Sequence, residues 1–381
     1  LRTSGPARLA GAAAREHILK IAVAVAALGI ALSMAGAVSV MVHSFRTTVI
    51  SWLNTTVIAD IYLRQDSGSN RLSGAIPDEL LQQLRADPRV AAVLTIRTAE
   101  RVFQGQRIRL GANEFAVAAT YRPLSFVEGN IRELERAKAE GGVLVSEVFA
   151  NRFGLRKGAT FPFADRAIPI HAVFRSYASE RGFVLMDTSL FAELVAPRGP
   201  SGVALYLNED GEPEKAMQAL RESLSDYALD MSLSTEIRAQ AITIFNQTFR
   251  LTYILQLIAG GIAALSVITT LTGLALERRR EFATLQALGA KPGLLDRAMA
   301  WESQIIAWSA MAIAFPGSVL LSVLLIHVIN RYSFGWTIES AVPYSDLLIA
   351  AAGITVLALV AALAPIRLIR RQNIAQILKQ D

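Results

Sequence analysis

The sequence predicts an α-helical membrane protein with four transmembrane helices and a mixed α/β extracytoplasmic domain between the first two. Three observations carry this prediction: an apolar composition, four long uncharged runs, and basic residues gathered at one end of each run. Hydrophobic residues make up 52% of the 381 residues and charged residues only 18%, whereas soluble domains carry about 25% charged residues. The chain has no cysteine, which excludes a disulfide framework, a thiol nucleophile and a cysteine-ligated metal site.

Four apolar runs are long enough to cross a bilayer, because about 20 helical residues span a hydrocarbon core about 30 Å thick. They are residues 21–42, 253–276, 305–328 and 347–366. None has a charged residue at its centre, and all are rich in small residues, which allow transmembrane helices to approach closely. Buried helices of a large soluble protein are the alternative, and four separate runs of spanning length argue against it.

Lysine and arginine near the ends of the runs set the expected orientation. Basic residues concentrate in segments 1–20, 277–304 and 367–381, which we expect to be cytoplasmic. The long segment 43–252 and the short segment 329–346 are then extracytoplasmic. The net charge of +6 is explained by this placement and predicts no nucleic-acid partner. The expected location is the cell (inner) membrane, with a multi-pass topology.

The long outer segment alternates between strand and helix patterns. Apolar or alternating stretches predict strands, and periodic stretches predict helices. Expected strands are 57–63, 90–103, 106–121 with a turn at 111–113, 142–146, 167–174, 184–186 and 202–207. Expected helices are 76–86, a short one that ends near Gly154, and 213–229.

The helices of the first two spans are expected to continue outward, because each approach carries one apolar stripe at helical spacing. The stripe after the first span contains Phe45, Val49, Trp52 and Leu53, and the stripe before the second contains Ile237, Ala241, Ile244, Phe245 and Thr248. Two such stripes predict an antiparallel helical stalk at the ends of the outer domain. The alternative is that each stripe merely covers the outer domain.

No catalytic constellation is visible in the sequence. The four histidines are not spaced as metal ligands on a helix face, and neither a Walker A loop nor a G-x-S-x-G elbow occurs. We therefore expect no enzyme activity and no cofactor, and any ATP to be bound by a partner chain.

The stretch after the second span has an ordered combination of residues. The helix leaves the membrane with three arginines at the level of the lipid headgroups. Gly289 is suited to end this helix, and Pro292 permits another to begin. Arg278, Glu281, Ala283, Leu285, Ala287, Leu288 and Gly289 resemble the R-x-x-E-x-A-x-L-x-A-L-G signature of the FtsX-like ABC transporter permeases, the family of MacB, LolC and LolE. The order of one span, an outer domain and three spans is similar to that family, as is the element from Gly142 to Gly158.

The resemblance implies a MacB-like periplasmic core domain and a permease subunit without its own ATPase. It implies that a cytoplasmic ABC ATPase contacts the loop through Arg278, Arg279, Glu281, Leu285, Gly289, Leu294, Leu295 and Arg297. ATP hydrolysis would then move the outer domain to export or extract a lipoprotein, lipid, peptide or similar substrate. The other expected partners are membrane lipid and a second permease half or a homodimer mate. A membrane sensor or mechanical signal transmitter to a periplasmic partner is the alternative function.

Two segments resemble a longer subgroup in which the four-span unit occurs twice in one polypeptide. They are Arg331 to Thr337, between the third and fourth spans, and Val184 to Asp187 in the outer domain. Since the chain begins at Leu1, it is expected to be the C-terminal half of such a duplicated permease. One departure from the family is Ala159-Thr160, where many relatives have an Asp.

Overall fold

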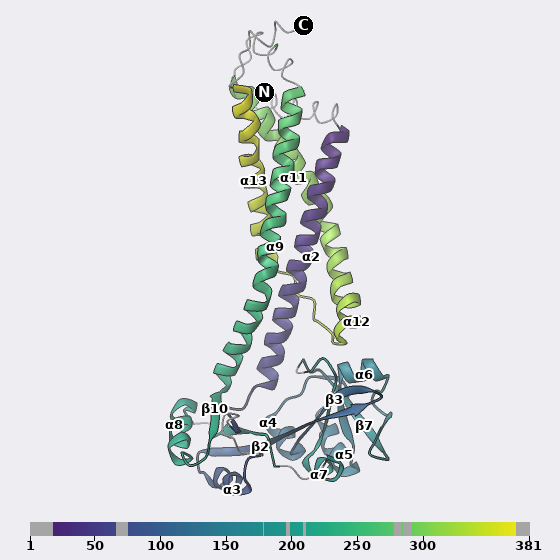
Figure 1. Cartoon of the computed structure of the whole chain (residues 1–381), viewed down its shortest axis with the longest axis vertical. Coiled ribbons are helices and arrows are strands. Elements are labelled where there is room, and N and C mark those ends of the chain that lie inside the picture. The colour runs from purple at the N-terminus through teal and green to yellow at the C-terminus, as the bar shows by residue number, and fades with distance from the viewer. Residues whose placement is uncertain are drawn as a thin grey trace. The chain divides into compact units, whose positions relative to one another are not determined.

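The computed structural model describes residues 18–65, 75–177, 179–195, 199–208, 211–277, 284 and 292–370. They fall into two compact units (Figure 1). Unit 1 contains residues 1–44, 247–328 and 340–381, and unit 2 contains residues 45–246 and 329–339. The long helices α2 (Ile18–Thr56) and α9 (Ser234–Glu277) each contribute residues to both units.

Unit 1 is helical. Besides its parts of α2 and α9, it contains α11 (Pro292–Val323), most of a π-helical turn (Leu324–Ile329) and α13 (Tyr344–Arg370). Among the described residues, three helical segments are long and apolar enough to cross a membrane: Ile21–Thr56, Asp296–Phe334 and Tyr344–Leu363. They contain the predicted spans 21–42 and 305–328 and residues 347–363 of the predicted span 347–366. The fourth, 253–276, lies within α9, so the predicted count of four rests on the sequence.

Small residues bring α2 and α11 close together within unit 1. A Cβ added at Gly36 would lie 2.4 Å from Oγ of Ser318, and one at Gly317 would lie 2.4 Å from Oγ of Ser33. Ser318 donates a hydrogen bond to the carbonyl of Ser33 at 3.1 Å. The Gly and Ser content of the apolar runs therefore serves the close helix approach that the sequence predicts.

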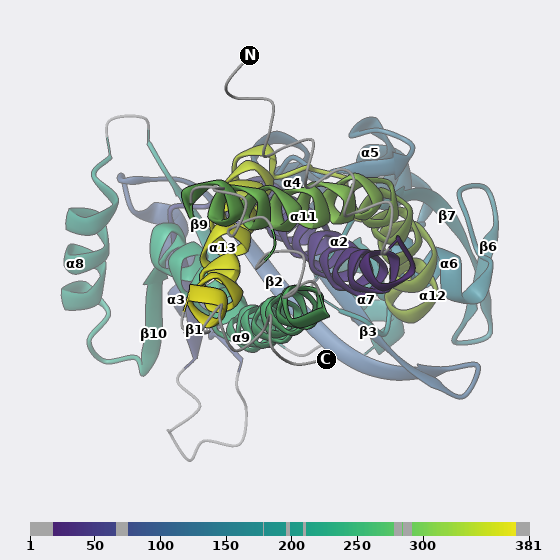
Figure 2. The ribbon, with the colours of Figure 1, turned by 90° about the horizontal axis from the view of Figure 1, so that it is seen from above.

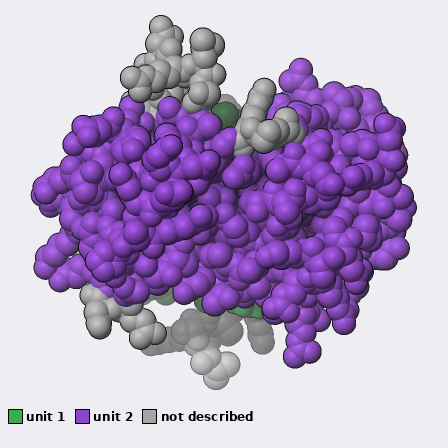
Figure 3. Space-filling view, turned by 90° about the horizontal axis from the view of Figure 1, so that it is seen from below, with its two compact units in different colours: residues 1–44, 247–328, 340–381 green, residues 45–246, 329–339 purple. Residues whose placement is uncertain are grey.

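Unit 2 is a mixed α/β domain, one face of which is seen in Figure 3. Its strands are β1 (Ile61–Gln65), β2 (Val90–Phe103), β3 (Gln106–Asn113), β4 (Phe126–Glu128), β5 (Val143–Ser146), β6 (Thr160–Phe163), β7 (Arg166–Phe174), β8 (Phe183–Asp187), β9 (Gly202–Leu207) and β10 (Leu229–Leu233). Its shorter helices are α3 (Asp78–Ala86), α4 (Phe115–Tyr121), α5 (Arg132–Glu140), α6 (Glu147–Phe153), α7 (Thr188–Val195), α8 (Pro213–Ser223) and α12 (Asn330–Phe334).

The described strands pair in the order β10-β1-β9-β2-β3-β8-β5-β7-β4, and β6 pairs with β7. β10 and β6 lie at opposite ends of the unit (Figure 2). The long strand β2 pairs with β9 from Val90 to Ile96 and with β3 from Arg97 to Phe103. It therefore divides the sheet into a β10-β1-β9 half and a β3-β8-β5-β7-β4 half.

Each half has its own apolar core. In the first half, Leu80 and Leu84 of α3 and Leu220 of α8 pack on one face of β1 and β9. Ala118 of α4 packs on the opposite face. In the second half, the largest cluster joins apolar residues of β3, β5, β7 and β8 to α6 and α7. Burial of apolar area in both halves is the main stabilising contribution to this unit.

Three sequence predictions for this unit are wrong in detail. The strand expected at 57–63 begins at Ile61, because α2 continues to Thr56. The stretch 106–121 is a strand only to Asn113, and its hairpin turn lies at Gln104-Gly105, which have positive φ, not at 111–113. The helix expected over 213–229 ends at Ser223, because Leu229 begins an edge strand that pairs with β1.

Candidate functional site

Apart from Thr248, which belongs to unit 1, the predicted stalk residues lie on the parts of α2 and α9 that belong to unit 2. The rings of Phe45 and Phe245 are in contact, with centroids 5.6 Å apart and an interplanar angle of 43°. Further along, Arg238 of α9 lies 3.5 Å from the Asn54 side-chain oxygen of α2. The two helices therefore touch at two levels. We call the Phe45–Phe245 pair the stalk contact.

The remaining stalk residues face different surroundings. Trp52 contacts Tyr177 of the outer domain edge to face, with centroids 5.7 Å apart. Val49 and Ile237 are half-buried, and Ile244 is 56% exposed. The stripe on α2 thus contacts both α9 and the outer domain, which combines the two interpretations that the sequence left open. The role of these residues in coupling stays a prediction.

Residues 329–339, which follow the third predicted span, pack into unit 2. We call them the connection. After α12, Gly335 adopts a left-handed conformation with φ of 76°, which glycine adopts at little cost. This turn buries Trp336, whose ring lies 5.5 Å from Phe334, 5.5 Å from Tyr177 and 6.2 Å from Phe45. The Asn330 side chain closes the turn by donating to the Trp336 carbonyl and accepting from its indole nitrogen.

Directed hydrogen bonds join the connection to α6. The Glu147 carboxylate accepts from the backbone nitrogen of Thr337 at 3.2 Å and also from its hydroxyl. Asn151 donates to the Gly335 carbonyl at 2.8 Å. Ser146, the N-cap of α6, accepts from the backbone nitrogens of Phe149 and Phe183, which fixes the start of this helix. The connection is therefore bonded to a firmly anchored element.

Two further residues bond the connection to unit 2. The Tyr177 hydroxyl donates to the Thr337 carbonyl at 2.7 Å, and burial, with Glu147 nearby, raises the pKa of Tyr177 to about 12. Arg175 forms an ion pair with Glu339 at 3.1 Å. The backbone nitrogen of Glu339 also donates to Thr48 on α2. The connection thus contacts both α2 and the outer domain.

From the sequence, the segment Arg331 to Thr337 was interpreted only as a resemblance to a subgroup of the family, and these contacts were not predicted. The available signal was the Gly335-Trp336-Thr337 sequence, with a large aromatic directly after a helix-ending glycine. Its partners Glu147, Asn151 and Tyr177 are distant in sequence, and no local pattern identifies them.

The predicted ATPase-contacting residues are only partly described. Arg278, Arg279, Glu281, Leu285 and Gly289 lie outside the described residues. α11 begins at Pro292, as the sequence suggests. On this helix, Leu294 is half-buried and Arg297 is exposed. Leu295 is also part of the helix.

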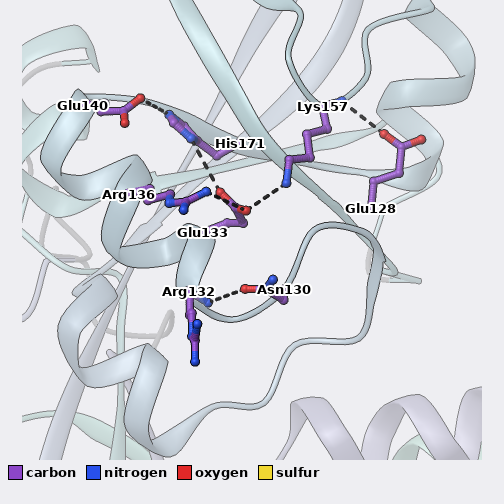
Figure 4. Close-up of polar contacts among 8 residues, drawn as sticks. All are labelled: Glu128, Asn130, Arg132, Glu133, Arg136, Glu140, Lys157 and His171. Carbon is purple, nitrogen blue, oxygen red and sulfur yellow. Dashed lines mark hydrogen bonds and ion pairs between the residues drawn. The ribbon is translucent and has the colours of Figure 1, made fainter.

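A cluster of charged residues surrounds Glu133 in unit 2 (Figure 4). The buried Glu133 carboxylate accepts from Lys157 at 2.8 Å and lies 3.4 Å from Arg136 and 3.9 Å from His171. His171 lies 3.3 Å from Glu140 on its other side. Lys157, with Arg136 and His171, lowers the pKa of the Glu133 carboxyl against the effect of burial. These contacts tie α5 to β7 and to the chain after α6, which is a structural role.

Among the described residues, no group of three or more His, Asp or Glu side chains could hold a metal ion. The contacts described above are aromatic packing between helices and hydrogen bonds between the connection and unit 2.

The C-terminal part of the chain is similar to a known family. Residues 253–374 match the family model described as FtsX-like permease C-terminal. This part of the chain is similar to the FtsX-like permease family, in agreement with the resemblance predicted from the sequence.

The chain is also similar to a particular relative, a Mycobacterium tuberculosis protein named as an ABC transporter permease. The two are 27% identical over 377 residues, which cover 96% of this chain and 44% of that protein. The chain therefore spans less than half the length of this relative.

Two solved structures are similar to part of the chain. The periplasmic region of MacB from Actinobacillus actinomycetemcomitans has 12% identity and a TM-score of 0.39, over 50% of this chain and 95% of that structure. The extracellular domain of the ABC-type transporter YknZ from Gram-positive bacteria has 13% identity and a TM-score of 0.33, over 45% of this chain and 98% of that structure.

Proposed function

We propose that this FtsX-like permease is the transmembrane subunit of an ABC transporter in the cell (inner) membrane, and that a separate cytoplasmic ATPase drives it. The match of residues 253–374 and the similarity to a protein named as an ABC transporter permease support this function. Movement of unit 2 then exports or extracts a lipoprotein, lipid, peptide or similar substrate at the extracytoplasmic side.

One observation carries the proposal furthest. Unit 2 contains segments of α2 and α9 and the connection between α11 and α13, and these segments contact one another at Phe45, Phe245 and Trp336. A domain that only tethered a ligand would need no such convergence. The convergence supports a domain whose conformation is set by helices that cross the membrane.

Exposed apolar side chains support a lipid environment and a second permease half or homodimer mate. In unit 1, α9 exposes Leu251, Ile254, Leu255, Leu257, Ile258, Ile262 and Leu265. A contiguous exposed apolar face of this kind marks contact with lipid or with another protein. We assign this face of α9 to lipid and to the partner half.

The ATPase contact is proposed for segment 277–304. Leu295→Asp places a charge on its short apolar face and should abolish co-purification of the ATPase, because burial of an unpaired carboxylate costs several kcal/mol. Leu295→Met, which keeps the face apolar, is the matched control and should retain the ATPase. Equal co-purification with both variants would place the ATPase contact elsewhere.

The stalk contact tests transmission. Phe45→Cys combined with Phe245→Cys can be cross-linked without background, since the chain has no cysteine. We expect the cross-link to form, to leave ATPase association intact and to abolish coupling of ATP hydrolysis to changes in unit 2, measured as nucleotide-dependent labelling of a cysteine in that unit. Unchanged nucleotide-dependent labelling after cross-linking would show that the stalk does not transmit movement.

A further inference from the structure

Unit 2 contains two open cavities that share lining residues, and we call the two together the groove. The first has a volume of about 560 Å³ and the second about 400 Å³, and Glu100 and Arg109 line both. Each volume lies within the range of small-molecule sites, about 300–1,000 Å³. The groove crosses the sheet where β2 passes from one half to the other, since Ile96, Thr98 and Glu100 of β2 line it.

The two ends of the groove are formed by residues of the contacts described above. Val57, directly after α2, and Ile237 of α9 line the first cavity. Tyr177 and Trp336, which pack together in the connection, line the second. A displacement of α2, α9 or the connection would therefore change the shape of the groove directly.

Four exposed arginines line the groove. Arg64, Arg107, Arg109 and Arg181 are exposed, and within the described part of the chain their guanidinium groups form no hydrogen bond or ion pair. Elsewhere in unit 2, Arg89, Arg156 and Arg166 each form an ion pair with an acidic residue.

The groove also brings two acidic residues, Glu100 and Glu180, to the same surface. Four guanidiniums against two carboxylates leave an excess of positive charge. Guanidinium groups bind phosphate and carboxylate with directed, charge-assisted hydrogen bonds. The excess therefore fits an anionic ligand.

The two cavities of the groove differ in their linings. The half-buried apolar residues Val57, Ile96 and Ile237 line only the first cavity, together with Arg64 and Arg109, whereas Arg107, Ser179 and Arg181 line the second. A ligand that fills both therefore has an apolar part next to an anionic part.

We propose that this groove binds an anionic amphiphile, a molecule with one apolar chain beside a phosphate or carboxylate group. The apolar chain occupies the cavity near Val57 and Ile237, and the anionic group contacts Arg107, Arg109 and Arg181. That the ligand is a transported substrate rests on the proposed function, whereas the binding itself does not.

Protection of an introduced cysteine tests the groove in the full chain, reconstituted in phosphatidylcholine nanodiscs. Thr98→Cys places a thiol in the first cavity, and Ser223→Cys on α8 places one outside both cavities. The probe is dodecyl phosphate, and the rate of maleimide labelling is measured. At saturating probe we expect labelling at position 98 to slow by about fivefold or more and labelling at position 223 to stay unchanged, because only an occupied groove hides a thiol.

Three comparison ligands separate the possible sources of binding. Dodecyl phosphocholine has the chain without net charge, inorganic phosphate has the charge without the chain, and a tetraglutamate peptide has anionic charge on a peptide. All three should protect position 98 less than dodecyl phosphate does. Equal protection by dodecyl phosphocholine would overturn the anionic assignment, and stronger protection by tetraglutamate would make the groove a peptide site.

Charge variants test the assigned contacts. In the Thr98→Cys background, Arg107→Ala combined with Arg109→Ala should weaken protection by dodecyl phosphate by about tenfold or more in concentration, which is the factor expected for lost charge-assisted hydrogen bonds. Arg132→Ala combined with Arg152→Ala, two exposed arginines outside the groove, is the matched control and should leave protection unchanged.

Absence of protection in the otherwise unaltered Thr98→Cys chain would overturn the site even if the ATPase co-purifies. Protection without ATPase co-purification would leave the groove standing and overturn the permease function instead.

Discussion

The stalk contact and the connection hold unit 2 by different kinds of interaction. At the stalk contact, two phenylalanine rings meet at 5.6 Å, and the hydrogen bond from Arg238 to Asn54 on the same two helices is long, at 3.5 Å. In the connection, Trp336 is enclosed by three aromatic rings, and the adjoining backbone is bonded to Glu147, Asn151 and Tyr177. Apolar packing is non-directional, whereas hydrogen bonds require one geometry. The stalk contact is thus suited to sliding, and the connection to a defined position.

The largest expected effect of a single substitution is at Trp336. Trp336→Ala removes a ring that is only 7% exposed, and truncation of a buried tryptophan costs about 3–5 kcal/mol. We expect a clear loss of thermal stability of the purified chain. Trp301→Ala is the matched control, since Trp301 is 41% exposed and should change stability little. Equal losses in the two variants would contradict the burial of Trp336.

The next effect concerns the hydrogen bonds between Thr337 and Glu147. Thr337→Val keeps the shape of the side chain but removes the hydroxyl donor, so the carboxylate loses a partner at a cost of about 1–3 kcal/mol. The expected result is a lower melting temperature. Thr120→Val, which loses only a long 3.4 Å bond on an exposed helix face, should have a smaller effect. A melting temperature unchanged by Thr337→Val would argue that this bond does not fix the connection.

A smaller effect is expected at the stalk contact. Phe245→Leu keeps the side chain apolar and removes its ring interaction with Phe45, and such ring interactions contribute about 0.5–1.5 kcal/mol beyond buried area. Phe245 is used because Phe45 also packs against Trp336 of the connection. The melting temperature should fall less than in Thr337→Val. If Phe245→Leu proves more costly than Thr337→Val, the contrast between a sliding contact and a fixed one is wrong.

The smallest effect on stability at neutral pH is expected in the charged cluster around Glu133 (Figure 4), which belongs to neither contact. The folded-state pKa of Glu133 is lowered, so its contribution to stability is present above the ordinary glutamate pKa of about 4.3 and is lost as the pH falls through the lowered value. The fall in melting temperature from about pH 7 to about pH 3 should therefore be smaller in Glu133→Gln than in the unaltered chain. Glu135→Gln, on the exposed side of the same helix, should keep the full pH dependence.

The sequence predicted the parts of this molecule whose signals are local. Apolar runs located the helices, and Gly154, which ends α6 in a left-handed conformation, was recognised from its place after a short helical pattern. The alternation in 90–103 predicted β2 with its observed bounds. These signals need no knowledge of distant residues, because helix ends and strand faces are encoded within a few positions.

Elements that depend on tertiary partners were not predictable. Residues 115–121 form α4, where the Asp187 carboxylate accepts from the backbone nitrogen of Phe115 at 3.0 Å from far along the chain. β10 is a strand because it pairs with β1, and its own sequence continues the pattern of α8. The connection was missed for the same reason, since its partners on α6 are remote in sequence.

The strand β2 has a mechanical consequence. It pairs with β9 along its first part and with β3 along its second part, so one extended backbone is hydrogen-bonded into both halves of the sheet. A β-strand resists stretching but twists readily, as the range of twist in natural sheets shows. A rotation of one half against the other therefore concentrates in the backbone near Ile96 and Arg97. The torsion of this short stretch sets the angle between the β10-β1-β9 half and the β3-β8-β5-β7-β4 half of the sheet.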